Sequence, residues 1–257
     1  MSAEAQSRDD GGELTLDELI RGRIRVWQPR AGYRVNVDSV LLAHFVGAPP
    51  YGRVVDLGAG VGVIGLALAV RDPSARVVLA ELQPRSAELA RRNVIENGCE
   101  GRVDVVNIDL ADERAARAVL PGASFDRVVS SPPYFLLSAG PPVPDESEAI
   151  ARHEIRLDLS QLTKAARRLL VPGGRAFIVF PSERLPALIE ALQSEGLRPI
   201  RLRPVYARMG QGIAANRVLV EAQKGARAGL VLEEPLYVRD AAGAYTEEAR
   251  VALGESI

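Results

Sequence analysis

Cysteine, histidine and lysine are all scarce in this chain of 257 residues. Cys99 is the single cysteine, so the chain can form no intramolecular disulfide and no zinc site built from cysteines. We expect no metal cofactor. A chain without disulfides is typical of the reducing cytoplasm, which is therefore the expected compartment.

Long apolar runs are also missing. Residues 1–12 are polar and acidic and lack the apolar stretch of a secretory signal, so we expect a disordered tail there. No apolar run is long enough to cross a bilayer, and we expect no membrane partner. The hydrophobic fraction of 47% is ordinary for a globular protein with a core.

Positive charge comes almost entirely from arginine, because Lys164 and Lys224 are the only lysines. The formal net charge is −1, so the molecule as a whole is not basic and any nucleic acid would meet a local patch. Arginine binds phosphate through two hydrogen bonds at once, although a genome rich in G and C would also favour arginine codons. Two arginine clusters, at 21–34 and 198–208, can either contact phosphate or lie on a solvated face.

From residue 53 onward, short apolar strands alternate with helices, the pattern of a parallel sheet covered on both faces. The last two strands lack a helix between them and can form a hairpin, which would make the final strand antiparallel. We therefore predict an α/β, Rossmann-like fold with a mostly parallel seven-stranded sheet. The seven strands are expected at residues 53–57, 76–81, 102–108, 125–130, 175–180, 200–206 and 217–223.

The flanking segments complete the predicted organisation. Strands at 24–29 and 33–37 are expected to form a hairpin, and Asp38 with Ser39 is expected to cap the helix that follows. Four segments are expected in all: a disordered tail at 1–12, a segment covering the ligands at 13–50, a core at 51–223 and a C-terminal appendage at 224–257.

A glycine-rich turn follows the first predicted strand of the sheet. Gly60, Gly62 and Gly65 satisfy the dinucleotide fingerprint G-x-G-x-x-G, but that short pattern is weak on its own. Asp56 followed by Gly58, Gly60 and Gly62 is the fuller match, and it resembles the first motif of class I methyltransferases, which use S-adenosylmethionine (SAM). Ligands of open α/β sheets bind at this edge, where glycine lets the backbone come close.

Acidic residues follow the next two strands. SAM needs acceptors for its ammonium group and its hydroxyls, and Glu81 ends the second strand, where a carboxylate can take both ribose hydroxyls. Asp109 follows the third strand, where it can accept from the adenine amino group. Each acid alone could equally cap a helix or lie in a solvated loop. Acids at three successive strand ends, Asp56 included, favour a SAM site.

The fourth strand ends in Ser131-Pro132-Pro133-Tyr134. A proline-rich turn would account for these residues without any function, but their place beside the expected SAM site resembles the motif of enzymes that methylate planar exocyclic nitrogens. The Ser131 side chain and the Pro132 carbonyl can accept the two N–H bonds of such an amine, and Tyr134 can stack on its ring. We predict Ser131, Pro132 and Tyr134 as catalytic residues that align the amine with the methyl donor.

Across residues 14–253 the chain resembles the bacterial tRNA(Val) adenine-N6 methyltransferase family. The resemblance is carried by residues 32–43, 56–62, 131–135, 151–154 and 245–248. It implies a SAM-dependent N-methyltransferase that modifies the adenine just 3′ of the tRNA anticodon. The SAM-binding residues expected on this basis are Asn36, Asp38, Asp56, Gly58, Ala59, Gly60, Glu81, Leu82, Asp109, Leu110 and Ser131. The expected substrate-binding residues are Arg34, Pro133, Tyr134 and Arg152.

The target group stays open at this point, because the family usually has asparagine where this chain has Ser131. The sequence Ser-Pro-Pro-Tyr also resembles enzymes that methylate cytosine N4, and a glutamine amide in a protein makes the same chemical demands. A SAM-binding RNA module without catalysis would not need residues 131–134, and an NAD-dependent oxidoreductase would leave them unexplained. We expect RNA, in the first place tRNA, as the partner, and among the open oligomeric states a monomer is favoured.

Overall fold

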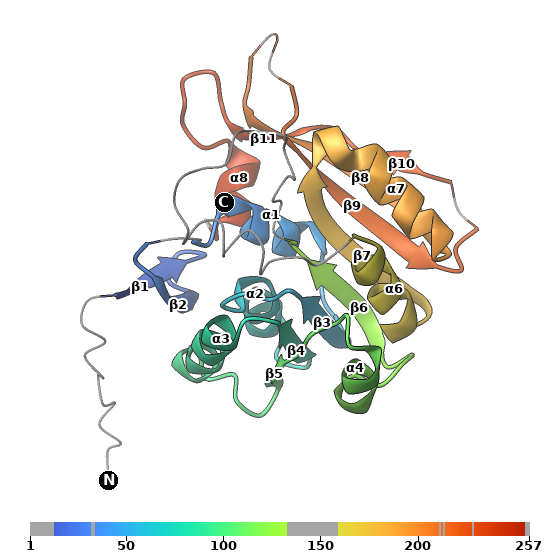
Figure 1. Cartoon of the computed structure of the whole chain (residues 1–257). Helices are drawn as coiled ribbons and strands as arrows, with labels where there is room; N and C mark the ends of the chain where they lie inside the picture. The colour runs from blue at the N-terminus through green and yellow to red at the C-terminus, as the bar shows by residue number, and fades with distance from the viewer. Residues whose placement is uncertain are drawn as a thin grey trace, which may run out of the picture.

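A mixed sheet of nine strands forms the centre of the protein in the computed structural model, which describes residues 13–31, 34–132, 159–210, 212, 214–227 and 229–254 (Figure 1). The strands lie in the order β10-β8-β9-β7-β6-β3-β4-β5, and β11 also pairs with β8. Their bounds are β3 Arg53–Leu57, β4 Arg76–Glu81, β5 Val103–Asn107, β6 Phe125–Ser130, β7 Leu170–Pro181, β8 Leu197–Arg208, β9 Arg217–Lys224, β10 Val231–Leu232 and β11 Leu236–Arg239.

The predicted α/β fold is confirmed. All seven predicted strands form, and β9, the last of them, runs antiparallel to its neighbours β7 and β8. The other described pairs in this sheet are parallel. Two short strands that were not predicted, β10 and β11, lengthen the sheet on the far side of β8. The strand order reverses between β3 and β6, and such a reversal opens a crevice at the carboxyl ends of the strands.

Helices cover both faces of the sheet, as Figure 1 shows. One face carries α1 (Val37–Phe45), α2 (Val63–Arg71) and α3 (Pro84–Glu96), with α8 (Glu247–Ala252) beside α1. The other face carries α4 (Glu113–Val119), α6 (Leu159–Leu169) and α7 (Leu185–Ser194), the last preceded by the short 3₁₀ helix η1 (Ser182–Arg184). Each face has its own apolar core, and the strands between them are buried on both sides.

An antiparallel hairpin precedes the sheet, but its strands differ from the prediction. β1 (Leu14–Leu19) pairs with β2 (Ile24–Pro29), so the strand predicted at 33–37 is wrong. The connection at residues 20–23 carries the left-handed backbone of a tight turn, with φ of 73° at Gly22. Residues 34–36 are not part of a strand, and Val37 already begins α1. The tail predicted at 1–12 lies outside the described residues.

A buried asparagine on α3 connects this hairpin to the sheet. The side-chain carbonyl of Asn93 accepts a hydrogen bond of 2.6 Å from the Trp27 backbone N–H, and its amide donates to the carbonyls of Trp27 (3.0 Å) and Val61 (2.9 Å). The Arg92 guanidinium lies 3.7 Å from the centre of the Trp27 ring. One side chain, Asn93, therefore positions both the hairpin and the glycine-rich turn after β3.

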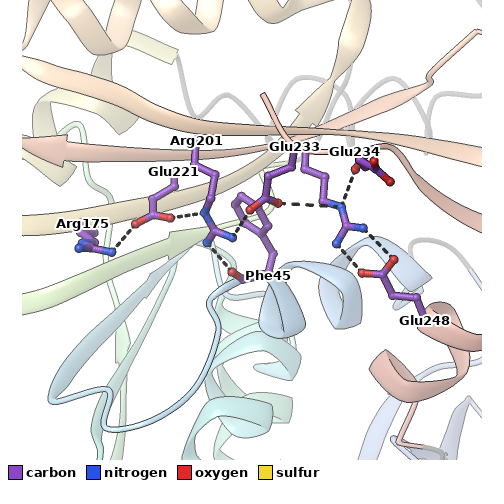
Figure 2. A network of polar contacts seen from close by, with 8 residues as sticks. Phe45, Arg175, Arg201, Glu221, Glu233, Glu234 and Glu248 are labelled. Atoms are coloured by element: carbon purple, nitrogen blue, oxygen red, sulfur yellow. Dashed lines mark hydrogen bonds and ion pairs between the residues drawn. The ribbon is translucent and has the colours of Figure 1, made fainter. Parts of the chain in front are cut away.

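A chain of ion pairs joins β8 and β9 to the C-terminal helix (Figure 2). Glu221 on β9, which is almost fully buried, accepts from Arg175 at 2.8 Å and from Arg201 at 2.6 Å. Arg201 also pairs with Glu233 and donates to the Phe45 carbonyl, whereas Arg203 forms a two-point pair with Glu248 on α8. Carboxylates therefore pair with both guanidinium groups, whereas the sequence left Arg201 and Arg203 open between a phosphate contact and a solvated face.

Because Glu221 is buried, it is the member of this network whose removal should cost the most stability. Removing one partner of a buried ion pair leaves the other charge uncompensated, which costs about 3 kcal/mol. We predict that Glu221→Ala lowers the free energy of unfolding by about that amount in urea titrations. Glu113 is the matched control, because it also pairs with two cations, Lys164 and Arg117, but at the surface. Glu113→Ala should have a much smaller effect, and equal losses would contradict this assignment.

Candidate active site

The turn after β3 leaves open space above its backbone. Gly58 and Gly60 have φ of 70° and 57°, and a Cβ atom added at either would meet no atom within 4 Å. The backbone N–H groups of Gly58 and Ala59 donate to the Ala80 carbonyl of β4, at 2.9 and 3.1 Å. The turn is therefore tied to the neighbouring strand, and its other side can receive a ligand at close range.

Asp56 is fully buried beneath this turn. Its Oδ2 accepts a 3.1 Å hydrogen bond from the Gly65 N–H at the start of α2, whereas its Oδ1 is buried without a partner in the described chain. Burial raises the pKa of this carboxyl to about 7, with a smaller lowering from the Gly65 hydrogen bond and a small further rise from Glu81. An unpaired buried acceptor is costly, so this oxygen suits a ligand that carries a donor or a positive charge.

Glu81 lies at the end of β4, where the sequence predicts it. Its Oε2 accepts from the Gly60 N–H at 2.7 Å and its Oε1 from the Gln83 N–H at 2.9 Å. Each carboxylate oxygen can accept a second hydrogen bond, so Glu81 can still bind two hydroxyls. The next residue, Leu82, is 40% exposed and offers an apolar surface beside the carboxylate.

Asp109 and Leu110 follow the end of β5, as the sequence predicts. Asp109 is exposed, and its Oδ1 accepts from the Ala111 N–H at 2.8 Å, whereas Leu110 is partly buried against the core. Asn107 ties β5 to β4, because its amide donates to the carbonyls of Glu81 and Leu82 at 2.9 and 2.8 Å. Sequence reasoning missed Asn107, although a polar residue at the end of a predicted strand was a usable signal.

Two serines end β6, next to β3 in the sheet. The Ser130 hydroxyl donates to the Leu57 carbonyl at 2.7 Å, which joins the ends of the two strands. The Ser131 hydroxyl is buried and, within the described chain, has no partner. Among the described side chains, Asp56 Oδ1 and Ser131 Oγ are the two buried oxygens or nitrogens left in this state, and both lie at the same edge of the sheet. Pro132 is buried, whereas Pro133, Tyr134 and Arg152 lie outside the described residues.

The start of α1 comes to the same edge through an ion pair that the sequence did not reveal. Asp38 Oδ2 accepts from Arg217 Nε at 3.0 Å, and Arg217 begins β9 opposite Pro181 at the end of β7. Asn36, not Asp38, caps the helix, because its side chain accepts from the Asp38 N–H at 3.0 Å. Asp38 therefore lies in the first turn of α1 with its carboxylate directed to β9.

Arg34 has contacts within the hairpin. Its guanidinium donates to the Thr15 hydroxyl at 3.2 Å and to the Pro29 carbonyl at 3.1 Å, and it pairs with Asp17. These contacts give Arg34 a structural role in joining the hairpin to the segment before α1. Its predicted contact with substrate stays a prediction.

These donors and acceptors fit SAM. The unpartnered Asp56 oxygen can accept from the ammonium group, Glu81 can accept from ribose hydroxyls, and Leu82 can lie against a flat ring. Open space above Gly58 and Gly60 leaves room for the ligand backbone. A glycine turn and carboxylates at the crevice of a doubly wound sheet, with an antiparallel last strand, match the class I SAM-dependent methyltransferases.

Comparison with known proteins agrees with this class. Residues 32–192 match the family model of the methyltransferase small domain, and the chain belongs to this family. The methyltransferase class expected from the sequence is thereby confirmed, and the relatives described next confirm the expected family resemblance.

Curated relatives carry the name tRNA1(Val) (adenine(37)-N6)-methyltransferase. The protein of Porphyromonas gingivalis is 36% identical over 170 residues, which cover 65% of this chain and 66% of the relative, just under two thirds of its length. That of Bacteroides fragilis is 31% identical over 72% of this chain and 76% of the relative. That of Aeromonas salmonicida is 30% identical over 88% of this chain and 90% of the relative.

Solved structures of methyltransferases share the fold. A protein of Agrobacterium tumefaciens, described as a predicted O-methyltransferase, has a TM-score of 0.67 and 27% identity, over 85% of this chain and 98% of that one. The 16S rRNA N2 G1207 methyltransferase of Thermus thermophilus, solved with AdoMet and guanosine, has a TM-score of 0.55 and 20% identity, over 82% of this chain and 50% of that one. At that identity the second likeness concerns the fold alone.

The raised pKa of Asp56 gives a test that needs no substrate. The carboxyl titrates near 3.8 in the unfolded chain and at about 7 in the folded protein, so between these values the folded state holds an extra proton. The free energy of unfolding of the SAM-free protein should therefore fall as pH rises from 4 to 8, by up to about 4 kcal/mol from this group.

The Asp56→Asn variant should lack this pH-dependent part of the free energy of unfolding. Urea unfolding of both proteins at several pH values between 5 and 8 measures it, with the difference between wild type and variant as the readout. Parallel pH profiles would contradict the burial of an ionisable group at this position.

Proposed function

We propose that this protein transfers a methyl group from SAM to the N6 amino group of an adenine in the anticodon loop of tRNA. The observation that carries the proposal is the buried Ser131 hydroxyl, which has no partner among the described residues and lies one strand away from the Asp56 oxygen in the same state. An acceptor for an N–H group thus lies beside an acceptor for the cofactor ammonium. The names of the curated relatives support adenine in tRNA as the target.

The chemistry at this edge consists mainly of alignment. The lone pair of an aromatic amine is delocalised into its ring, which makes the nitrogen a poor nucleophile. Ser131 Oγ and the Pro132 carbonyl can accept the two N–H bonds and hold the nitrogen with its lone pair toward the methyl donor. SAM supplies a methyl group on a positively charged sulfur. The N–C bond forms as the S–C bond breaks, and the nitrogen then releases one proton to water.

Other predicted roles belong to the same proposal. Asp56 and Glu81 hold SAM with the backbone of Gly58, Ala59 and Gly60, whereas Asn36 and Asp38 cover it from the start of α1. Asp109, Leu110 and Leu82 border the adenine of SAM. Pro133, Tyr134, Arg34 and Arg152 contact the substrate. A tRNA substrate places the enzyme in the cytoplasm.

Nucleoside analysis tests the target atom directly. Purified protein is incubated with isotopically labelled SAM and, in separate reactions, with a pool of tRNAs transcribed in vitro or with the proteins of a cell extract. The RNA and the proteins are then digested and analysed by mass spectrometry. We expect label in N6-methyladenosine. Label in N4-methylcytidine would move the target to cytosine, and label in a protein glutamine from cell extract, with none in RNA, would contradict an RNA substrate.

Ser131 variants test the alignment of the amine. Ser131→Ala removes one acceptor of the amine and should lower kcat about tenfold or more, because the lost contact is made to the base. Ser131→Asn restores an acceptor and should retain substantial activity on adenine. Ser194→Ala, at the exposed end of α7, is the control. Full activity of Ser131→Ala would show that this hydroxyl does not hold the amine.

A further inference from the structure

Two rows of side chains lie on one face of the β8–β11 pair, at the edge of the sheet where the site lies. Tyr206 of β8 is in register with Tyr237 of β11, and their ring centres are 5.1 Å apart. Two residues further on, Arg208 is in register with Arg239. Side chains in register across paired strands point to the same face, and so do residues two apart along a strand. The four side chains therefore form two adjacent rows, one aromatic and one basic.

A third tyrosine extends the surface. Arg239 forms an antiparallel bridge with Tyr245, and its guanidinium lies 4.2 Å from the centre of that ring. Tyr245 is 38% exposed, and both arginines are exposed. We call Tyr206, Arg208, Tyr237, Arg239 and Tyr245 the Tyr/Arg surface.

The arginines of this surface differ from those of the network in Figure 2. On the opposite face of β8, Arg201 and Arg203 are paired with carboxylates. Arg208 and Arg239 instead donate to the backbone carbonyls of Ala241 and Gly243, and no carboxylate of the described chain pairs with either. Like charges opposite each other destabilise a strand pair, so this arrangement favours an anionic ligand.

The position of the surface suits the proposed substrate. β8 runs in the same direction as β6, and three strand spacings, about 14 Å, separate them. The last pair between β8 and β9 joins Val205 to Arg217, and β8 continues from there to Arg208. The surface therefore lies just past the edge of the sheet at which Ser131 follows β6. A few nucleotides span that distance.

We propose that the Tyr/Arg surface binds the single-stranded nucleotides that flank the target adenine, with bases stacked on the tyrosines and phosphates held by Arg208 and Arg239. This inference rests on the proposed function, since it assumes an RNA substrate. Aromatic rings next to arginines bind unpaired bases with little sequence preference. A flipped or looped target would leave such bases exposed on either side.

Steady-state kinetics on transcribed tRNA tests the surface, with the double variant Arg208→Ala/Arg239→Ala. Its KM for tRNA should rise about tenfold or more, with kcat and the SAM dissociation constant within twofold of wild type. A plot of log affinity against log salt concentration has a negative slope, and each lost phosphate contact on a single strand should make that slope shallower by about 0.7.

The matched control removes the same charge elsewhere. Arg76→Ala/Arg114→Ala changes an exposed residue at the start of β4, whose guanidinium also donates to a backbone carbonyl, and an exposed residue of α4. Its KM should stay near wild type. Tyr206→Ala should raise KM, whereas Tyr206→Phe keeps the ring and should not. Thermal unfolding of every variant identifies any that are misfolded.

The outcomes separate this inference from the proposed function. If wild type methylates tRNA but both double variants have equal KM values, the Tyr/Arg surface is not the RNA contact and the proposed function stands. If wild type methylates no tRNA under any salt condition, the proposed function fails and this inference fails with it. If Tyr206→Phe raises the KM for tRNA as much as Tyr206→Ala does, stacking of a base on this ring is contradicted.

Discussion

The buried carboxylate of Asp56 is the constraint on which the site depends. One of its oxygens accepts from the Gly65 N–H in the first turn of α2, and the other lies below the glycine turn without a partner among the described residues. Burying an acid there raises its pKa and costs stability at neutral pH. Two further contacts fix the turn above Asp56, because Glu81 accepts from the Gly60 N–H and the Ser130 hydroxyl donates to the Leu57 carbonyl.

Strand β8 shows how one element can serve stability on one face and recognition on the other. Arg201 and Arg203 point to α1 and α8, where Glu221, Glu233 and Glu248 compensate their charge and connect the C-terminal helix to the sheet. Beyond Val205, β8 extends past its last pair with β9 and pairs with β11. The cations there, Arg208 of β8 and Arg239 of β11, have no carboxylate partner among the described residues, which leaves a positive potential at the edge of the site.

The sequence was most informative where the structure is local and periodic. The strands β3, β4 and β6, which end at Leu57, Glu81 and Ser130, were predicted with the correct bounds, because parallel strands buried on both faces are continuous apolar runs. The hairpin was wrong, because apolar and polar residues alternate both before and after residues 24–29, and this pattern alone does not show that the preceding segment, Leu14–Leu19, is the partner. Asn93, Asn107 and the Arg217 pair of Asp38 were missed because each joins residues far apart in the chain. For Pro133, Tyr134 and Arg152 the predictions rest on sequence alone.

The central claim is that the oxygens of Asp56, Glu81 and Ser131 place a methyl donor and an aromatic amine side by side at one edge of the sheet. A crystal structure with S-adenosylhomocysteine and adenosine monophosphate tests it most directly. We expect Glu81 within hydrogen-bond distance of the ribose hydroxyls and Ser131 Oγ about 3 Å from the N6 amine of the nucleotide. The account would be contradicted by a nucleotide bound elsewhere, or by one whose amine faces away from Ser131.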